Sequence, residues 1–254
     1  LTLPEGSMGR IAADIDADNN EFIYIPGIEK VWRIQVHPEH LSIDDAWAPE
    51  YRQEGGEHGL SWDSCIADNA LWLMDNGDVD SLRAIYSRYP NGRFDSPNDS
   101  LSWRRPAPWK GRQRLLKVPL NDAPIQTIMP FENEGGGIIA PPVHIPELQT
   151  CIAWDSINGG LAGISTENNE LNVRWRLDAR PSMQPVVFPE TAELVINDYH
   201  TGDDQLIVVD ILSGDVLSRV STGSRVANGM FLTPGINRDI YYCSTLAICR
   251  VVWR

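Results

Sequence analysis

Short apolar runs bounded by polar residues recur along the chain at nearly even intervals. Five of them, each three or four residues long, begin at Phe22, Leu71, Cys151, Leu194 and Ile240. Their length and polar flanks predict strands. The intervals between them are 49, 80, 43 and 46 residues. A period of roughly 40 to 50 residues built from short strands is typical of a β-propeller, in which each repeat folds as one sheet, or blade. The sequence therefore predicts an all-β fold, a β-propeller of about five four-stranded blades.

Turn-forming residues divide these repeats into strands. The fourth repeat is the clearest, with strands expected at 184–189, 193–198, 205–211 and 216–220. Strands of the first repeat are expected at 9–16, 21–26, 30–36 and near 42–48, and the third repeat spans 137–178. Those of the second are expected at 59–63, 70–74, 114–118 and 125–129. An insertion at about 83–113 explains the long interval, because removing about 35 residues from it restores the ordinary period.

The fifth repeat is one strand short. Its strands are expected at 230–232, 239–243 and 248–253. In one explanation, Leu1-Thr2-Leu3 supplies the missing strand and closes a five-bladed ring. In the other, the chain is part of a six- to eight-bladed propeller. The sequence leaves both explanations open.

Length and charge narrow the class of protein. A chain of 254 residues can bury one large core, so a single propeller domain covering residues 1–254 is expected. The formal net charge of -14 disfavours a nucleic-acid partner, because phosphates are neutralised by clustered Lys and Arg. No apolar run reaches the roughly 18 residues of a membrane span, so no membrane partner is expected. A soluble protein is expected, cytoplasmic or, if a leader has been removed, secreted or periplasmic.

The insertion region is basic, whereas the rest of the chain is acidic. Between Arg83 and Lys117 lie nine of the 21 basic residues and two acidic ones, which leaves a net charge of -21 elsewhere. Basic and aromatic side chains alternate in it, a pattern suited to anionic or sugar-like ligands. Its candidate ligand-binding residues are Arg88, Arg93, Trp103, Arg104, Arg105 and Trp109. The alternative is that the insertion packs against the acidic body of its own propeller.

Four cysteines are too few and too scattered for a disulfide framework or a zinc site. Cys243 and Cys249 are expected to face each other across a hairpin. A disulfide between them would require an oxidising compartment. The alternative is that the cysteines are small buried apolar residues.

Polar residues follow the apolar run at equivalent places in three repeats. The pairs are Asp75-Asn76, Asp155-Ser156 and Asn197-Asp198. Equivalent positions in a propeller form a ring around its axis, and oxygen ligands on such a ring would suit Ca²⁺ or another divalent metal. Asp and Asn also end strands by forming Asx-turns, which needs no metal.

Two segments resemble known propeller families. Residues 137–143, 152–155 and 159–164 resemble the repeats of the quinoprotein-like (PQQ-like) propellers. Residues 225–230, 239–242 and 250–251 are similar to the Asn-Gly blade of the regucalcin, gluconolactonase and strictosidine-synthase-like group. Neither segment covers more than two blades. A bound quinone is not expected, because the chain has no adjacent-cysteine pair and no tryptophan docking motif in every blade.

The second resemblance implies a divalent-metal site at the central channel. Its Glu would come from Pro4-Glu5-Gly6 or Glu57-His58-Gly59, and Asn228 would be the Asn-Gly ligand. The Asp of that family comes from a later blade, which this chain lacks. With the strand-end acids, the candidate metal ligands are therefore Asp75, Asp155, Asp198 and Asn228.

These features support two functional hypotheses. The first is a binding or interaction scaffold for a small-molecule or protein partner, including an anionic one, that uses the channel mouth and the insertion. The second is a divalent-metal-dependent lactonase- or esterase-like hydrolase. Its candidate bases are His200, two residues after Asp198, and His58, beside Glu57. No Gly-x-Ser-x-Gly elbow or His-Glu-x-x-His motif is present, so the sequence does not decide whether the protein is an enzyme.

Overall fold

The computed structural model describes residues 1–5, 10–27, 29–51, 61–76, 111–134, 136–138, 140–200, 202–225, 229–244 and 248–252. Within these ranges the chain divides into two compact units, Leu1–His144 and Ile145–Arg254, and each is described by itself. The single-domain organisation expected from the sequence stays a prediction. No helix in these ranges has the length and hydropathy that a membrane span needs.

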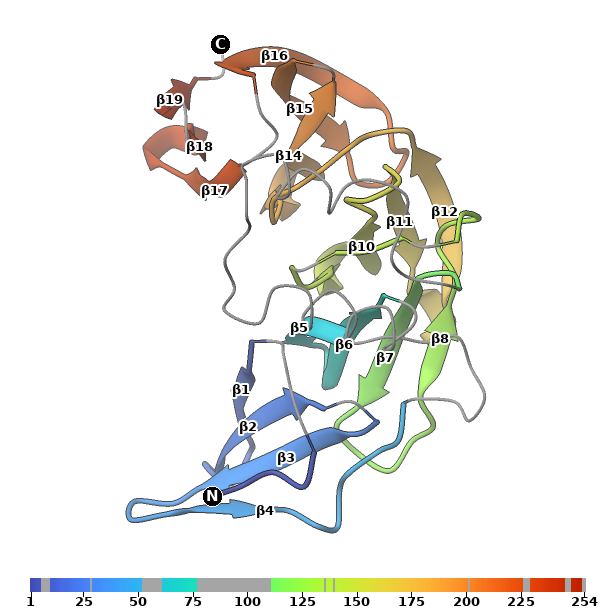
Figure 1. The fold of residues 1–254 in the computed structure, drawn as a ribbon, viewed down its shortest axis with the longest axis vertical. Coiled ribbons are helices and arrows are strands. Elements are labelled where there is room, and N and C mark those ends of the chain that lie inside the picture. Colours follow the sequence, from blue (N-terminus) through green and yellow to red (C-terminus); the bar gives the residue numbers. More distant parts are fainter. Residues whose placement is uncertain are drawn as a thin grey trace, which may run out of the picture. The chain divides into compact units, whose positions relative to one another are not determined.

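The first unit contains two four-stranded antiparallel sheets, each with its strands in chain order (Figure 1). The first sheet consists of β1 (Ala12–Ile15), β2 (Glu21–Pro26), β3 (Val31–Val36) and β4 (Leu41–Ile43). The second consists of β5 (Ser61–Ala67), β6 (Ala70–Asp75), β7 (Arg114–Pro119) and β8 (Gln126–Ile128). Strands β6 and β7 pair from Ala70↔Pro119 to Asp75↔Arg114. The second repeat is thus interrupted between its second and third strands, as the long interval predicts.

Three further antiparallel sheets follow along the chain. The third sheet consists of β9 (Val143–Ile145), β10 (Thr150–Trp154), β11 (Leu161–Ser165) and β12 (Asn172–Leu177). The fourth consists of β13 (Val186–Phe188), β14 (Glu193–His200), β15 (Asp203–Asp210) and β16 (Val216–Ser224). The fifth consists of β17 (Gly229–Pro234), β18 (Ile240–Ser244) and β19 (Ile248–Val251).

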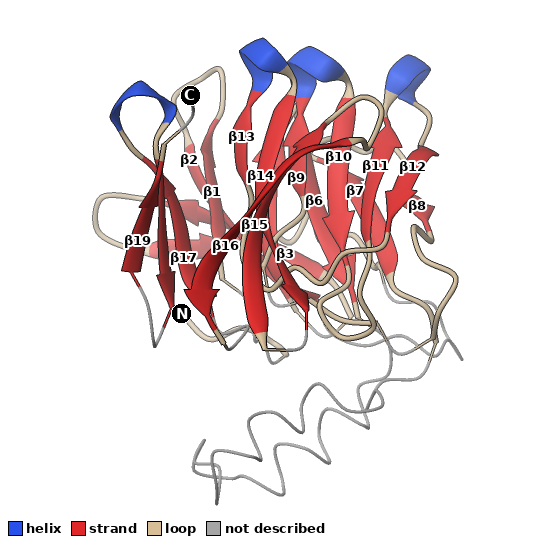
Figure 2. Ribbon diagram, turned by 90° about the horizontal axis from the view of Figure 1, so that it is seen from above, coloured by secondary structure: helices blue, strands red, loops and turns tan. Residues whose placement is uncertain are grey.

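Four single-turn 3-10 helices connect strands of these three sheets, and Figure 2 shows all four at the same end of the strands. They are η1 (Pro146–Leu148), η2 (Glu167–Asn169), η3 (Pro189–Thr191) and η4 (Ile236–Arg238). Proline occupies the first turn of η1 and η3, where its missing N–H costs no helical hydrogen bond.

The inner strands carry the apolar runs that revealed the repeat. All six residues of β6 and all five of β10 are buried, as expected for strands covered on both faces. Each of these strands carries a large aromatic side chain, Trp72 in β6 and Trp154 in β10, and both are fully buried. Trp175 of β12 donates its indole N–H to the Ile211 carbonyl at 2.8 Å, which joins the third sheet to the fourth.

The all-β prediction and its five repeats are confirmed, with two corrections of detail. Leu1-Thr2-Leu3 forms no strand, so the proposal that it completes the fifth sheet is wrong. Cys243 and Cys249 are free thiols and do not face each other. In the hairpin Cys243 is opposite Ile248 and Cys249 is opposite Tyr242, which places the two thiols on opposite faces of the sheet.

Candidate functional site

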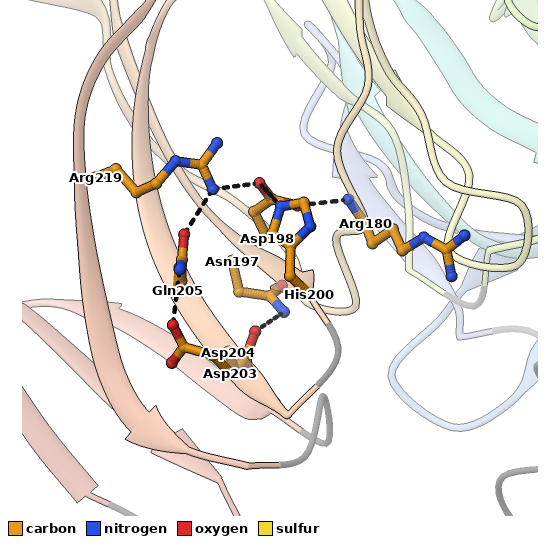
Figure 3. A network of polar contacts seen from close by, with 8 residues as sticks. All are labelled: Arg180, Asn197, Asp198, His200, Asp203, Asp204, Gln205 and Arg219. Atoms are coloured by element: carbon orange, nitrogen blue, oxygen red, sulfur yellow. Dashed lines mark hydrogen bonds and ion pairs between the residues drawn. The ribbon is translucent and has the colours of Figure 1, made fainter.

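A polar cluster is centred on Asp198, near the end of β14. Residues 194–198 are all buried, so the apolar strand ends in a carboxylate that is 0% exposed. A buried charge is tolerated only when it is paired and hydrogen-bonded. Asp198 Oδ1 accepts a hydrogen bond from the Arg180 backbone N–H at 2.9 Å, and Oδ2 accepts one from Arg219 Nη1 at 2.6 Å (Figure 3).

Asp198 Oδ2 has a second hydrogen-bond partner, His200 Nε2, at 2.9 Å. His200 is 57% exposed, so one nitrogen of its ring is fixed by the buried carboxylate while much of the ring faces solvent. When Nε2 donates to Asp198, the neutral ring carries its lone pair on Nδ1. Asp198 thus orients the imidazole of His200 so that its Nδ1 can accept a hydrogen bond or a proton from a ligand.

Opposing effects set the pKa of Asp198. Burial is the largest single effect and raises this pKa. The hydrogen bonds from the Arg180 amide, Arg219 and His200 lower it, and together they outweigh burial. The net result is a pKa below the ordinary value of 3.8. Asp198 is therefore ionised at neutral pH and favours positive or donating groups on its neighbours.

The cluster continues across β15 to β16. Arg219 Nη1 also donates to Gln205 Oε1 at 2.8 Å, and Gln205 Nε2 donates to Asp203 Oδ2 at 2.7 Å. The Ser221 hydroxyl donates to Asp203 Oδ1 at 2.6 Å. These hydrogen bonds, first from Ser221 and then from Gln205, lower the pKa of Asp203. These hydrogen bonds thus orient the side chains of Asp203, Gln205 and Arg219 relative to one another.

A buried polar layer lies next to this surface. Asn197 Nδ2 donates to Asp204 Oδ1 and to the Ser182 hydroxyl, both at 2.9 Å. Asp204 Oδ2 accepts the Tyr242 hydroxyl of β18 at 2.6 Å. Burial and, next, the bond to Asp204 raise the pKa of Tyr242. The layer links the fourth sheet to the fifth and makes a rigid support for the exposed cluster.

The other strand-end acids have different surroundings. Asp75 forms a buried ion pair with Arg114, whose Nη2 and Nε lie 2.5 Å and 3.1 Å from Asp75 Oδ2. Asp155 accepts the backbone N–H groups of Ile157 and Asn158 at 2.9 Å and 3.1 Å. Asp155 therefore forms the Asx-turn that was the alternative to metal binding.

The metal site itself stays a prediction. Asp75 lies in the first unit, and Asp155 and Asp198 lie in the second. Within the described ranges, no group of three His, Cys, Asp or Glu residues could hold a metal ion. The remaining candidate ligand, Asn228, lies outside those ranges.

Several candidate residues also lie outside the described residues. They are Glu57, His58, Arg88, Arg93, Trp103, Arg104, Arg105 and Trp109. Of the insertion at about 83–113, only residues 111–113 are described. The structure brings together Asp198 and His200, as their spacing suggested. It adds Arg219 and Gln205, which the sequence analysis missed because strand pairing, and not a motif, brings them to Asp198.

Comparison with known proteins shows the fold. No protein-family model and no curated protein sequence matches the chain. A candidate 6-phosphogluconolactonase from Bacteroides fragilis is similar in structure, with a TM-score of 0.53, 12% identity, and coverage of 87% of this chain and 60% of that chain. A second from Bacteroides uniformis has a TM-score of 0.51, 10% identity, and coverage of 88% and 61%.

A virginiamycin B lyase from Staphylococcus aureus, crystallised with quinupristin, is also similar, with a TM-score of 0.52 and 10% identity. The match covers 99% of this chain and 72% of that chain. The chain thus spans about three fifths of the length of the two Bacteroides proteins. With its five successive antiparallel sheets, the chain has the β-propeller fold.

Proposed function

We propose that this chain is a β-propeller binding scaffold and that the cluster of Asp198, His200 and Arg219 is part of its binding surface. One observation carries the proposal: a fully buried carboxylate fixes two partly exposed side chains, His200 at 57% and Arg219 at 38% exposure. Arg219 offers N–H donors, and His200 Nδ1 accepts a hydrogen bond in the neutral ring and donates one when the ring is protonated. Groups that are already held in place bind a ligand without the entropy cost of ordering them. The partner expected is a small molecule or protein segment that carries an anionic or hydrogen-bond-accepting group.

The basic insertion is proposed as a second contributor. Its arginines and tryptophans would bind an anionic or sugar-like ligand through charge and stacking. Deletion of residues 83–113 is expected to leave a folded propeller with weaker binding. If the deletion unfolds the protein, the insertion has a structural role instead.

Binding is tested with anionic metabolites and acidic peptides, screened by thermal shift and confirmed by calorimetry. The variants His200→Ala and Arg219→Ala are expected to weaken binding of any confirmed ligand at least tenfold, about 1.4 kcal/mol. His40→Ala, an exposed histidine of the first unit, is the matched control and is expected to bind like the wild type. Unchanged affinity in both site variants would refute the assignment of this surface.

A lactonase- or esterase-like hydrolase is the second candidate. The observation that favours it is the Asp198–His200 pair, because a carboxylate bound to an imidazole orients that ring as a general base. Two of the similar structures are candidate 6-phosphogluconolactonases, but the likeness to them concerns the fold alone. A divalent metal such as Ca²⁺, held by Asp155, Asp198 or Asn228, would supply Lewis-acid polarisation of the carbonyl.

The hydrolase proposal requires that a metal stabilises the native protein. Millimolar Ca²⁺ is expected to raise the melting temperature, and Asp155→Ala or Asn228→Ala is expected to abolish the shift. The absence of any shift with Ca²⁺ or another divalent ion would exclude this form of the hydrolase. Within the propeller fold, we retain the PQQ-like repeat type as the nearer sequence resemblance and the regucalcin-like group as the weaker one.

A further inference from the structure

A second polar arrangement lies in the first unit, in the turn between β2 and β3, and it surrounds a carboxylate of the chain itself. Glu5 Oε2 accepts the Glu29 backbone N–H at 2.8 Å. Glu5 Oε1 accepts the Lys30 backbone N–H at 3.1 Å and the Trp32 indole N–H at 2.7 Å. Three donors from one turn and one strand thus converge on both oxygens of a single carboxylate. We call these three N–H groups the cradle.

The turn has its own supports, which do not involve Glu5. The Tyr51 hydroxyl donates to the Gly27 carbonyl at 2.5 Å, and the Tyr51 backbone N–H donates to the Glu29 carbonyl at 3.1 Å. Tyr51 is 3% exposed and belongs to the core of the first unit. The Gly27 backbone N–H also donates to the Lys30 carbonyl at 2.7 Å. The turn backbone that carries the Glu29 and Lys30 donors is therefore held by bonds that do not depend on Glu5.

Gly27 provides the space for the carboxylate. A Cβ atom at this position would lie 2.2 Å from Glu5 Oε1 and 2.9 Å from Trp32 Nε1. Any larger residue at position 27 would therefore occupy the volume that the carboxylate fills. The Trp32 side chain is buried, so its N–H needs an acceptor when the carboxylate is absent.

We infer that the cradle is a binding site for carboxylate-bearing ligands and that Glu5 is its tethered, exchangeable occupant. The donors suit a carboxylate because they reach both of its oxygens, and each such bond is charge-assisted. A tethered group competes with an effective concentration in the millimolar range, so free ligands bind the wild type only weakly. Release of residues 1–5 would open the site.

Chemical rescue tests this inference, with acetate as the probe and the full chain as the protein. Glu5→Ala removes the occupant, and the signals of the Trp32 indole N–H and the Glu29 and Lys30 amides are followed by ¹H–¹⁵N NMR. Trp32→Phe assigns the indole signal. Acetate is expected to shift the three signals of Glu5→Ala saturably toward their wild-type positions, and chloride at the same ionic strength is not. The wild type is expected to bind acetate at least about tenfold more weakly.

Two further variants make the result specific. Gly27→Ala combined with Glu5→Ala is expected to lose the acetate response, because the methyl group fills the carboxylate position. Glu39→Ala removes an exposed carboxylate from the connection between β3 and β4 of the same sheet. This variant is expected to behave like the wild type. If Glu5→Ala does not fold in buffer, recovery of its fold by acetate and not by chloride is measured instead by circular dichroism, and no recovery would equally overturn the inference.

Two outcomes would overturn the inference. One is the absence of a saturable acetate response in the folded Glu5 variant. The other is an equal response after Gly27→Ala is added, which would place the acetate outside the cradle.

Discussion

The buried ion pair between Asp75 and Arg114 allows a sharp test of what this strand-end carboxylate does. The two side chains are 0% and 3% exposed, and Arg114 Nη2 also donates to the Tyr51 carbonyl at 3.3 Å. Removing one partner of a buried ion pair costs about 3–5 kcal/mol, because the remaining charge loses its counter-charge. Asp75→Asn and Arg114→Met are each expected to lower the free energy of unfolding of the first unit by that amount.

A double-mutant cycle isolates the interaction between the two groups. Once one charge is gone, removing the other relieves a penalty, so the double variant is expected to cost at least about 2 kcal/mol less than the sum of the single variants. Urea unfolding followed by circular dichroism and tryptophan fluorescence measures all four proteins. The exposed pair of Arg112 and Glu132, separated by 3.6 Å, is the matched control. Glu132→Gln is expected to cost less than about 1 kcal/mol.

The cycle can refute this reasoning directly. Additivity within about 0.5 kcal/mol would show that the two charges do not stabilise each other. A large cost for Asp75→Asn together with a small one for Arg114→Met would show that the carboxylate has a more important partner than Arg114. If Asp75 binds Ca²⁺, the cost of Asp75→Asn is expected to depend on added Ca²⁺.

Three further predictions concern individual side chains. The folded-state pKa of Asp198 lies below its ordinary value, so its contribution to stability is present above about pH 4 and is lost as the pH falls through the lowered pKa. Asp198→Asn is expected to flatten this acid limb in urea titrations, and an unchanged limb would contradict the assignment. Burial raises the pKa of the Cys65 thiol to about 11, so alkylation by iodoacetamide at neutral pH is expected to be at least about tenfold slower in the native than in the unfolded protein; equal rates would show that the thiol is accessible. A Cβ at Gly163 would lie 2.4 Å from the Trp175 ring, so Gly163→Ala is expected to cost about 1–3 kcal/mol in unfolding measurements. Trp175→Phe should relieve part of that cost, and a full cost in its presence would locate the clash elsewhere.

The strands could be predicted because a strand covered on both faces must be apolar throughout its length. The buried run of β10 and the run of residues 194–196 in β14 carry this signal without help from the rest of the chain. Turn residues then separated the outer strands, as at Gly214, whose φ of 79° suits glycine. The expected strand of Leu1-Thr2-Leu3 failed because its only support was the need for a partner at the edge of the fifth sheet.

The site was harder to predict because its contacts depend on pairing between strands. Asp75, Asp155 and Asp198 occupy equivalent places in the sequence repeat, yet one meets an arginine, one closes an Asx-turn and one binds a histidine. A pattern of apolar runs cannot distinguish these outcomes. The cysteines show the same limit, since a register difference of one residue moves a side chain to the other face.

The link from Asn197 through Asp204 to Tyr242 has a consequence for how the protein is degraded. In arrays of repeated units, stability resides largely in the contacts between neighbours. Loss of the fifth sheet, by proteolysis or by local opening, would remove the hydrogen bond that the Tyr242 hydroxyl donates to Asp204. This carboxylate is 0% exposed in the intact chain. The fourth sheet would then hold a buried charge with one donor fewer, and its own opening would follow more readily. The fourth and fifth sheets should therefore exchange their amide protons with solvent as one cooperative unit.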